Sequence, residues 1–172
     1  MNAARTPAAQ VLELCRAQGW TVGVAESLTG GALTSALVEV PGASLVLRGG
    51  VVAYATDLKN RLLGVDGELL GKLGAVAGPT ALAMAAGVRR ATGADVGLAT
   101  TGVAGPDPQD GHAPGLVFVA VVGPGRTVVR ELHLAGGRAA VRAAAVDAAL
   151  TLALDVLREA GPAVDPEISP PA

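Results

Sequence analysis

Short apolar segments that resemble buried strands alternate with longer segments of helical spacing along this chain. Residues 20–26, WTVGVAE, and residues 94–102, ADVGLATTG, combine β-branched and small apolar residues in the manner of buried strands. Two later runs, LVFVAVVG and TVVRELHL, flank a PGR turn and predict a hairpin. This alternation predicts a three-layer α/β domain with an antiparallel hairpin inserted late.

The remaining segments carry the usual signals of helix starts and stops. A longer strand is expected over residues 44–54, bent or bulged at Gly49-Gly50. Residues 55–65 are expected to form a turn and a short helix that ends near Gly64. The longer predicted helices cover residues 7–18, 30–40, 79–91 and 138–160.

Composition limits how such a domain can build its core. The chain has 172 residues, of which 51% are apolar, yet only Trp20, Tyr54 and Phe118 are aromatic. The core must therefore consist of Ala, Val and Leu. A chain of this length is most simply one domain, so we expect a single domain over residues 1–160 and a proline-rich, disordered tail over residues 161–172.

Charge and hydropathy exclude several classes of function. A net charge of −2 and a pI near 5.6 offer no basic surface for nucleic acid. No apolar run reaches about 18 residues, so no membrane span is predicted, and the N-terminus lacks the apolar core of a signal peptide, so a cytoplasmic location is predicted. The single cysteine, Cys15, has helical spacing with apolar neighbours and is expected in the core. An apolar surface and short hairpin strands lead us to expect a homo-oligomer.

Three loops hold most of the unusual polar residues, and each follows a predicted strand. They are residues 26–31, 54–59 and 100–115. In open α/β sheets, ligands bind beyond the carboxyl ends of the strands. The sequence therefore predicts a functional site where these three loops meet.

The first loop, AESLTGG, contains more polar residues than a simple turn requires. Thr29 is placed to cap the helix that follows, which leaves Ser27 free in the turn. The backbone N–H groups of Leu28, Thr29, Gly30 and Gly31 can then form an oxyanion hole or an anion cradle. Spacing alone leaves three interpretations of Ser27 open: a nucleophile, part of a phosphate-binding turn, or a helix cap.

A serine nucleophile needs a base, and Lys59 is the best candidate. His112 lies in a Pro/Gly-rich loop and His133 in the last strand, so a Ser-His-Asp triad is not expected; no His or Cys cluster has metal-ligand spacing. Lys59 follows Tyr54, the only tyrosine, by five residues. Burial can lower the pKa of a lysine far enough for it to act as a base, and Tyr54 is expected to relay the proton or to hold the ammonium group.

The third loop and the last helix provide candidates for substrate binding. Thr101, Gly102 and Gly105 offer a hydroxyl and backbone donors for a ribose or a phosphate. Arg138 and Arg142 are four residues apart and share one helix face. Arg138 lies at the start of its helix, where a cation opposes the helix dipole; a bound anion would explain this placement, and an ordinary solvated arginine is the alternative.

These motifs resemble, in order, those of one known family. AESLTGG, GGVVAYATDLK, GAV, TTGVAGPDPQDG, GLVFVAV and GGRAAVR match the C-terminal domain of the competence/damage-inducible CinA proteins over residues 7–157. Stand-alone members of that family are nicotinamide-nucleotide amidases. The resemblance implies a three-layer α/β/α sandwich with a mixed, mainly parallel sheet.

The resemblance also implies a reaction and its residues. It implies deamidation of nicotinamide mononucleotide to nicotinate mononucleotide and ammonia, a step of pyridine-nucleotide recycling, with no metal or organic cofactor. The family's catalytic serine, tyrosine and lysine fall on Ser27, Tyr54 and Lys59, and its binding loop and arginine fall on residues 101–105 and Arg138. The alternative is a non-catalytic nucleotide-binding or partner-binding module, which would need an anion cradle but no base.

Overall fold

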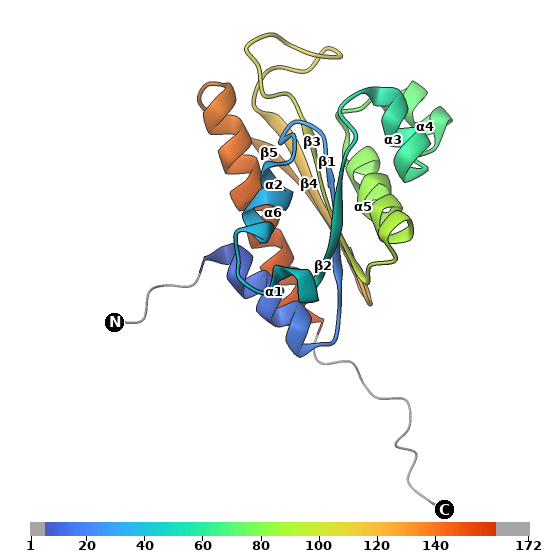
Figure 1. The fold of residues 1–172 in the computed structure, drawn as a ribbon. Coiled ribbons are helices and arrows are strands. Elements are labelled where there is room, and N and C mark those ends of the chain that lie inside the picture. The colour runs from blue at the N-terminus through green and yellow to red at the C-terminus, as the bar shows by residue number, and fades with distance from the viewer. Residues whose placement is uncertain (1–5, 161–172) are drawn as a thin grey trace, which may run out of the picture.

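Three layers make up the computed structural model, which describes residues 6–160 (Figure 1). The predicted tail over residues 161–172 lies outside the described residues. Helices cover both faces of a central five-stranded sheet, as predicted. The elements are α1 (Pro7–Ala17), β1 (Val22–Glu26), α2 (Ala32–Val38), the 3₁₀ helix η1 (Ala43–Leu45), β2 (Leu47–Val52), α3 (Thr56–Leu63), α4 (Gly67–Leu73), α5 (Gly78–Thr92), β3 (Val96–Gly102), β4 (Leu116–Gly123), β5 (Arg126–His133) and α6 (Arg138–Glu159).

The sheet is mixed, with strand order β2-β1-β3-β4-β5. β1 pairs in parallel with both β2 and β3, whereas β4 runs antiparallel to β3 and β5. The predicted late hairpin is therefore present as β4 and β5. Because β2, β1 and β3 are parallel neighbours, the loops that follow them leave the same edge of the sheet.

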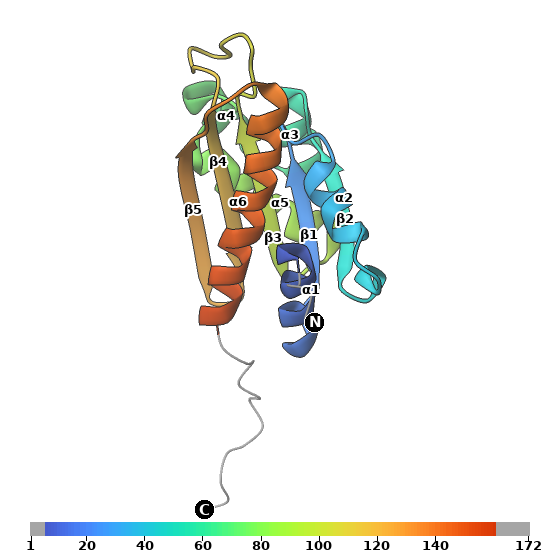
Figure 2. The same cartoon turned by 90° about the vertical axis from the view of Figure 1, so that its left-hand side faces the viewer.

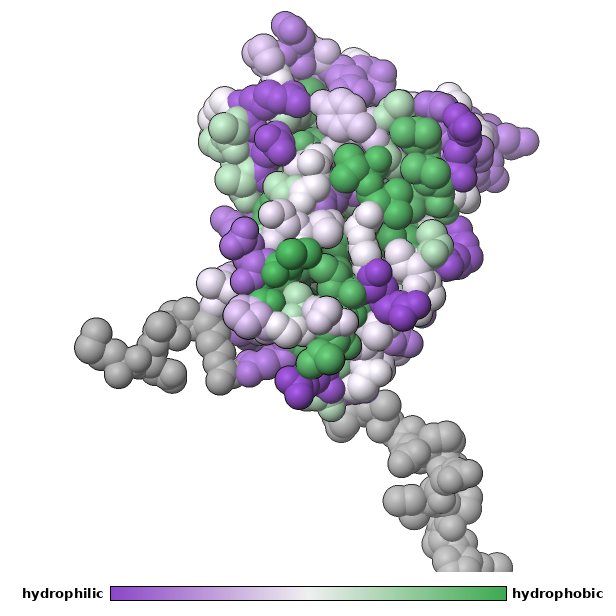
Figure 3. Space-filling view, in the orientation of Figure 1, coloured by the Kyte–Doolittle hydropathy of each residue, from purple (hydrophilic) through white to green (hydrophobic). Residues whose placement is uncertain are grey.

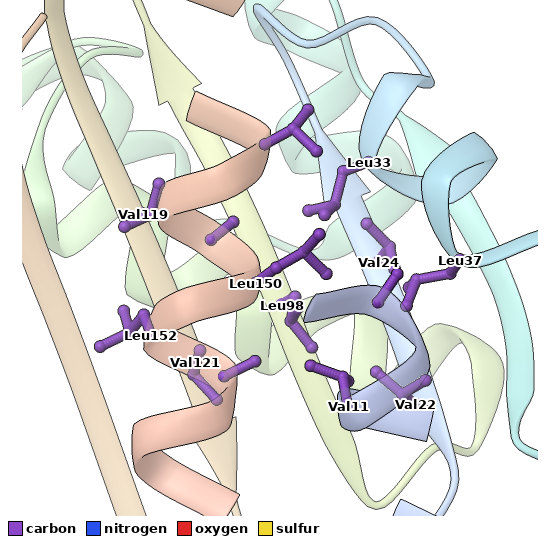
Figure 4. Packing of buried hydrophobic residues seen from close by; sticks show 14 of the residues in the cluster. Val11, Val22, Val24, Leu33, Leu37, Leu98, Val119, Val121, Leu150 and Leu152 are labelled. Carbon is purple, nitrogen blue, oxygen red and sulfur yellow. The ribbon is translucent and has the colours of Figure 1, made fainter. Parts of the chain in front are cut away.

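Two apolar clusters lie on the two faces of the sheet. The larger cluster joins α1, α2 and α6 to the sheet through Val, Leu and Ala side chains; Figure 2 views this face, and Figure 4 shows the packing of Leu33, Leu98 and Leu150 within it. Cys15 belongs to this cluster, as expected, and burial raises the pKa of its thiol to about 12. The smaller cluster lies under α3 and α5, where Gly87 allows α5 to approach the backbone of Leu63 closely.

Three features differ from the sequence predictions. The helix α4 has no predicted counterpart: none of its side chains is fully buried, although Leu69 and Leu70 pack partly buried against the smaller cluster and Asp66 caps the helix through the Glu68 amide. The expected strand over residues 44–54 begins later, after η1. Its irregularity falls at Arg48, one residue before the predicted position, where the β1–β2 register passes from Leu47 to Gly49.

The surface carries exposed apolar side chains on the side that presents the edge strand β2. Val38, Leu45, Val52 and Leu62 are all exposed there, and Figure 3 shows apolar surface in this view. Within residues 6–160, no helix is both long and apolar enough to cross a bilayer. The predicted homo-oligomer stays a prediction.

Candidate active site

A cavity of roughly 390 Å³ lies at the carboxyl edge of the parallel strands, where the three loops meet. Its wall includes Ser27 and Leu28 after β1, Tyr54 after β2, residues 102–109 after β3, and Arg138 at the start of α6. The predicted convergence of the three loops is thus present. Figure 1 shows the β3–β4 loop extending beyond the sheet at this end of the molecule.

Ser27 and Lys59 form a hydrogen-bonded pair at the base of this cavity. The Nζ atom of Lys59 lies 3.0 Å from the Oγ atom of Ser27. Ser27 retains 8% of its surface accessible to solvent, whereas Lys59 is completely buried. The serine therefore faces the cavity, and the lysine reaches it from inside the protein.

Two backbone carbonyls complete the surroundings of the lysine. Nζ of Lys59 donates to the carbonyl of Ala53 at 2.8 Å and to that of Tyr54 at 3.5 Å. A neutral amine has two N–H groups and one lone pair. Two carbonyls therefore accept both N–H groups and leave the lone pair for the Ser27 hydroxyl, which is the arrangement a general base requires.

Burial shifts the lysine toward this neutral form. The loss of hydration lowers the pKa of Lys59 from 10.5 to about 8, although the Asp110 carboxylate acts in the opposite direction. Asp110 lies on the β3–β4 loop and is not among the residues that line the cavity. A substantial fraction of Lys59 is therefore neutral in mildly alkaline solution.

The parallel sheet sets the spacing of the pair. The amide of Ala53 donates to the carbonyl of Glu26 at 2.9 Å, which extends the β1–β2 pairing into the two loops. The amide of Ser27 donates to the carbonyl of Thr100 at 3.0 Å and ties the same turn to β3. Sheet hydrogen bonds thus place the serine loop beside the loop that precedes Lys59.

Glu26 has a definite structural role that the sequence did not reveal. Its buried carboxylate accepts hydrogen bonds from the amides of Gly31, Leu33 and Thr34 and from the Thr34 hydroxyl, at 2.6–3.0 Å. These amides belong to the start of α2, where a negative charge is stabilised. Glu26 therefore caps α2 from the preceding strand.

The prediction that Thr29 caps α2 is wrong. Gly31 occupies the N-cap position of α2, and the Thr29 hydroxyl instead shares a 2.7 Å hydrogen bond with the hydroxyl of Thr100. Thr29 is buried, and the Glu26 carboxylate accepts the Gly31 amide that a capping threonine at this position could have bound. The helix also begins two residues later than predicted, at Ala32.

The four predicted loop amides divide into two groups. The Gly30 amide donates to the Ser27 carbonyl and the Gly31 amide to the Glu26 carboxylate, so neither is available to a substrate. Leu28 and Thr29 have amides with no acceptor within residues 6–160. Of the four amides predicted to form an oxyanion hole or an anion cradle, those of Leu28 and Thr29 are therefore the ones available to a ligand.

Tyr54 lies at the cavity with its hydroxyl directed to an arginine. The side chain is 58% exposed, and its hydroxyl accepts a 3.0 Å hydrogen bond from Arg138. The one atom of Tyr54 that contacts Lys59 is its backbone carbonyl oxygen. The predicted contact between the Tyr54 hydroxyl and the lysine is absent, because the side chain points outward from the β2–α3 turn.

Arg138 joins two walls of the cavity. Besides the Tyr54 hydroxyl, its guanidinium donates to the Gly105 carbonyl at 3.0 Å. Gly102 and Gly105 line the cavity, as predicted. Thr101 does not, because it is buried and its hydroxyl donates to the Ala75 carbonyl.

Arg142 differs from Arg138 despite sharing its helix face. Its guanidinium donates to the carbonyls of Leu28 at 3.0 Å and Thr29 at 2.7 Å. Spacing placed it beside Arg138 but gave no indication of this contact with backbone atoms. Within residues 6–160, no group of three or more His, Cys, Asp or Glu side chains is arranged to hold a metal ion.

Comparison with known proteins gives a consistent result. The model of the CinA C-terminal domain matches residues 4–157. A CinA-like protein of Frankia casuarinae is 51% identical over 142 residues, and a putative competence-damage inducible protein of Bacillus velezensis is 43% identical over 148 residues. These matches cover 83% and 86% of this chain but 33% and 36% of the relatives, so the chain spans about a third of their length.

Solved structures agree with the sequence matches. The competence damage-inducible protein A from Klebsiella pneumoniae superposes with a TM-score of 0.84 at 33% identity, covering 88% of this chain and 95% of that one. The competence/damage inducible protein CihA from Agrobacterium tumefaciens gives 0.80 at 34% identity, covering 92% and 99%. The chain belongs to the CinA C-terminal domain family.

Proposed function

We propose that the protein is a serine amidase that hydrolyses the carboxamide of nicotinamide mononucleotide. One observation carries the proposal: the buried Lys59 amine lies 3.0 Å from the Ser27 hydroxyl at the base of an open cavity. Burying a lysine is costly, and a structural role does not require it to contact a serine. The names of the relatives refer to competence and damage induction and specify no reaction.

The reaction proceeds in two halves. Neutral Lys59 accepts the Ser27 proton while the serine oxygen attacks the carboxamide carbon. The resulting oxyanion accepts hydrogen bonds from the amides of Leu28 and Thr29. Protonated Lys59 then gives its proton to the leaving nitrogen, and ammonia departs from an ester on Ser27. In the second half Lys59 removes a proton from water, which attacks the ester, and the regenerated ammonium returns a proton to the serine oxygen.

The cavity is suited to a nucleotide of this size and charge. Its volume lies within the range of about 300–1,000 Å³ that is usual for small-molecule sites. Arg138 is exposed at its wall, and two hydrogen bonds leave further guanidinium N–H groups for a phosphate. Gly102 and Gly105 allow the substrate to approach the backbone of the third loop.

The rival proposal, a non-catalytic nucleotide-binding module, would use the SLTGG turn as an anion cradle. The Glu26 carboxylate already occupies the amides of Gly31, Leu33 and Thr34, so an external phosphate has no free cradle at the start of α2. A cradle would also have no use for a buried base. Both observations favour the amidase.

Ammonia release from nicotinamide mononucleotide tests the proposal. Ser27→Ala and Lys59→Met should each lose at least about 10³-fold in kcat, because each removes a partner of the nucleophilic step. The matched control is Lys72→Met, since Lys72 is the only other lysine and lies exposed on α4. Nicotinamide riboside, which lacks the phosphate, should raise KM rather than lower kcat. Tight nucleotide binding without ammonia release by the unaltered protein would establish the binding module instead.

A further inference from the structure

Two consecutive peptide groups in the serine turn present free amides, and in each the carbonyl is held. The Leu28 amide shares its peptide plane with the Ser27 carbonyl, which accepts the Gly30 amide at 3.1 Å. The Thr29 amide shares its plane with the Leu28 carbonyl, which accepts Nε of Arg142 at 3.0 Å. Because a trans peptide is planar, its N–H points opposite to its C=O. Holding each carbonyl therefore fixes the direction of each free amide.

Arg142 controls both of these peptide groups. It holds the Leu28 carbonyl directly, and its Nη2 atom also holds the Thr29 carbonyl at 2.7 Å. The Thr29 carbonyl belongs to the same peptide as the Gly30 amide, which in turn holds the Ser27 carbonyl. One guanidinium on α6 thus fixes the Thr29 amide directly and the Leu28 amide through Gly30.

The backbone of the turn holds this arrangement only in part: the Thr29 carbonyl also accepts the Ala32 amide at 3.2 Å, whereas within residues 6–160 the Leu28 carbonyl accepts from Arg142 alone. Gly30 and Gly31 have φ values of 60° and 99°, a region in which glycine is flexible. Glu26 holds the turn from the helix side through Gly31 but contacts neither peptide that carries a free amide. A charged donor on a carbonyl also polarises the peptide and strengthens its N–H as a donor.

We propose that Arg142 is a positioning residue that holds the Leu28 and Thr29 amides as the oxyanion hole of Ser27. It acts through the backbone and contacts no substrate. The inference rests on the proposed function in one respect, namely that Ser27 is a nucleophile. It does not depend on which amide is hydrolysed.

Arg142→Ala and Arg142→Lys test this role in two assays. The first is ammonia release from nicotinamide mononucleotide. The second is the rate at which a fluorophosphonate modifies Ser27, followed by intact mass. In that reaction the serine oxygen bonds to phosphorus, fluoride leaves, the serine proton passes to Lys59, and the phosphoryl oxygen takes the developing charge. The control is Arg48→Ala, which removes an arginine-to-carbonyl contact with Thr92 at the other end of the sheet.

We expect Arg142→Ala to lower both kcat and the labelling rate by about 10²-fold, the usual loss when an oxyanion donor is removed. KM should stay within about threefold of its original value and the pH midpoint of the rate should not move, because neither Arg138 nor Lys59 is altered. The kcat and the labelling rate of Arg142→Lys should lie between those of Arg142→Ala and of the unaltered protein, since an ammonium can bind one carbonyl but not both. Millimolar guanidinium should restore part of the rate of Arg142→Ala, and Arg48→Ala should match the unaltered protein.

The outcomes separate this inference from the proposed function. Slow labelling of Arg142→Ala would support the positioning role even if the unaltered protein releases no ammonia, and only the substrate assignment would then fail. Equal labelling of the variant and the unaltered protein would overturn the positioning role and leave the amidase intact. A raised KM with unchanged kcat would assign Arg142 to phosphate binding instead. Absence of labelling in the unaltered protein would overturn the inference, because it requires a nucleophilic Ser27.

Discussion

The buried amine of Lys59 predicts an unusual dependence of stability on pH. Its pKa falls from 10.5 to about 8 on folding, and one pKa unit corresponds to about 1.36 kcal/mol. Protonated Lys59 therefore destabilises the fold by about 3 kcal/mol. The full cost is present below pH 8, where folded and unfolded chains both carry the proton. Between pH 8 and 10.5 the unfolded chain binds more protons than the folded one, so the free energy of unfolding rises with pH.

Substitution of Lys59 by Met isolates this effect, because methionine has a similar unbranched shape and no charge. Urea unfolding of the two proteins from pH 7 to 10.5 should show the unaltered protein gaining about 3 kcal/mol relative to Lys59→Met. The variant also loses the contacts with the Ala53 and Tyr54 carbonyls, but that loss is the same at each pH. Titration of the Cys15 thiol occurs in both proteins and cancels in the difference.

Lys72→Met provides the control, because its exposed ammonium makes only an i, i+4 ion pair with Glu68. Its pH dependence should follow that of the unaltered protein. Since the chain has only these two lysines, ¹³C-labelled lysine gives two resonances whose titrations can be assigned with the same variants. A difference between the unaltered protein and Lys59→Met that stays constant across this pH range would refute the depressed pKa and, with it, the neutral base.

Three further substitutions have definite expectations. Tyr54→Phe removes only the hydroxyl that accepts Arg138, so kcat should fall less than about tenfold with an unchanged pH midpoint; a loss as large as that of Ser27→Ala would restore the proton-relay role. Glu26→Gln replaces an acceptor of four hydrogen bonds and should lower the free energy of unfolding by about 2 kcal/mol in urea titrations; an unaffected midpoint would contradict the capping role. Gly87→Ala would place Cβ within van der Waals overlap of the Leu63 carbonyl and should cost about 1–3 kcal/mol, measurable as a lower Tm with retained Ser27 labelling.

Local patterns were sufficient to predict most of the fold. The strands β1 and β3, the late hairpin and the long helix α6 carry strong periodicity and clear turn residues, so their positions follow closely from the chain. Their arrangement in three layers is confirmed. The helix α4 was missed because it is only seven residues long and has no fully buried side chain, and the start of β2 was misplaced because the apolar residues before Leu47 form a 3₁₀ turn instead of strand.

The candidate site likewise contains contacts that the sequence could predict and contacts that it could not. The meeting of Ser27 and Lys59 could be anticipated, since both follow adjacent parallel strands and resemble a family motif. The roles of Glu26 and Arg142 could not, because both side chains bind backbone atoms whose direction only the folded turn determines. The predicted roles of Thr29 and the Tyr54 hydroxyl differ from their contacts because their partners, the Thr100 hydroxyl and Arg138, lie far away in sequence and meet them only in the folded chain.

The antiparallel direction of β4 has a consequence for how such a site can diversify. Because β4 returns beside β3, their connection stays at the cavity, and its base is tied by the Val103 and Leu116 backbones. The tip of this loop forms a wall of the cavity without contributing to the Ser27–Lys59 pair. Exchanging the tip for that of a relative would change which ligands fit the cavity while Ser27 and Lys59 stay in place. Asp110 is the exception, since its carboxylate raises the pKa of Lys59, so an exchanged loop would also shift the pH at which Lys59 becomes neutral.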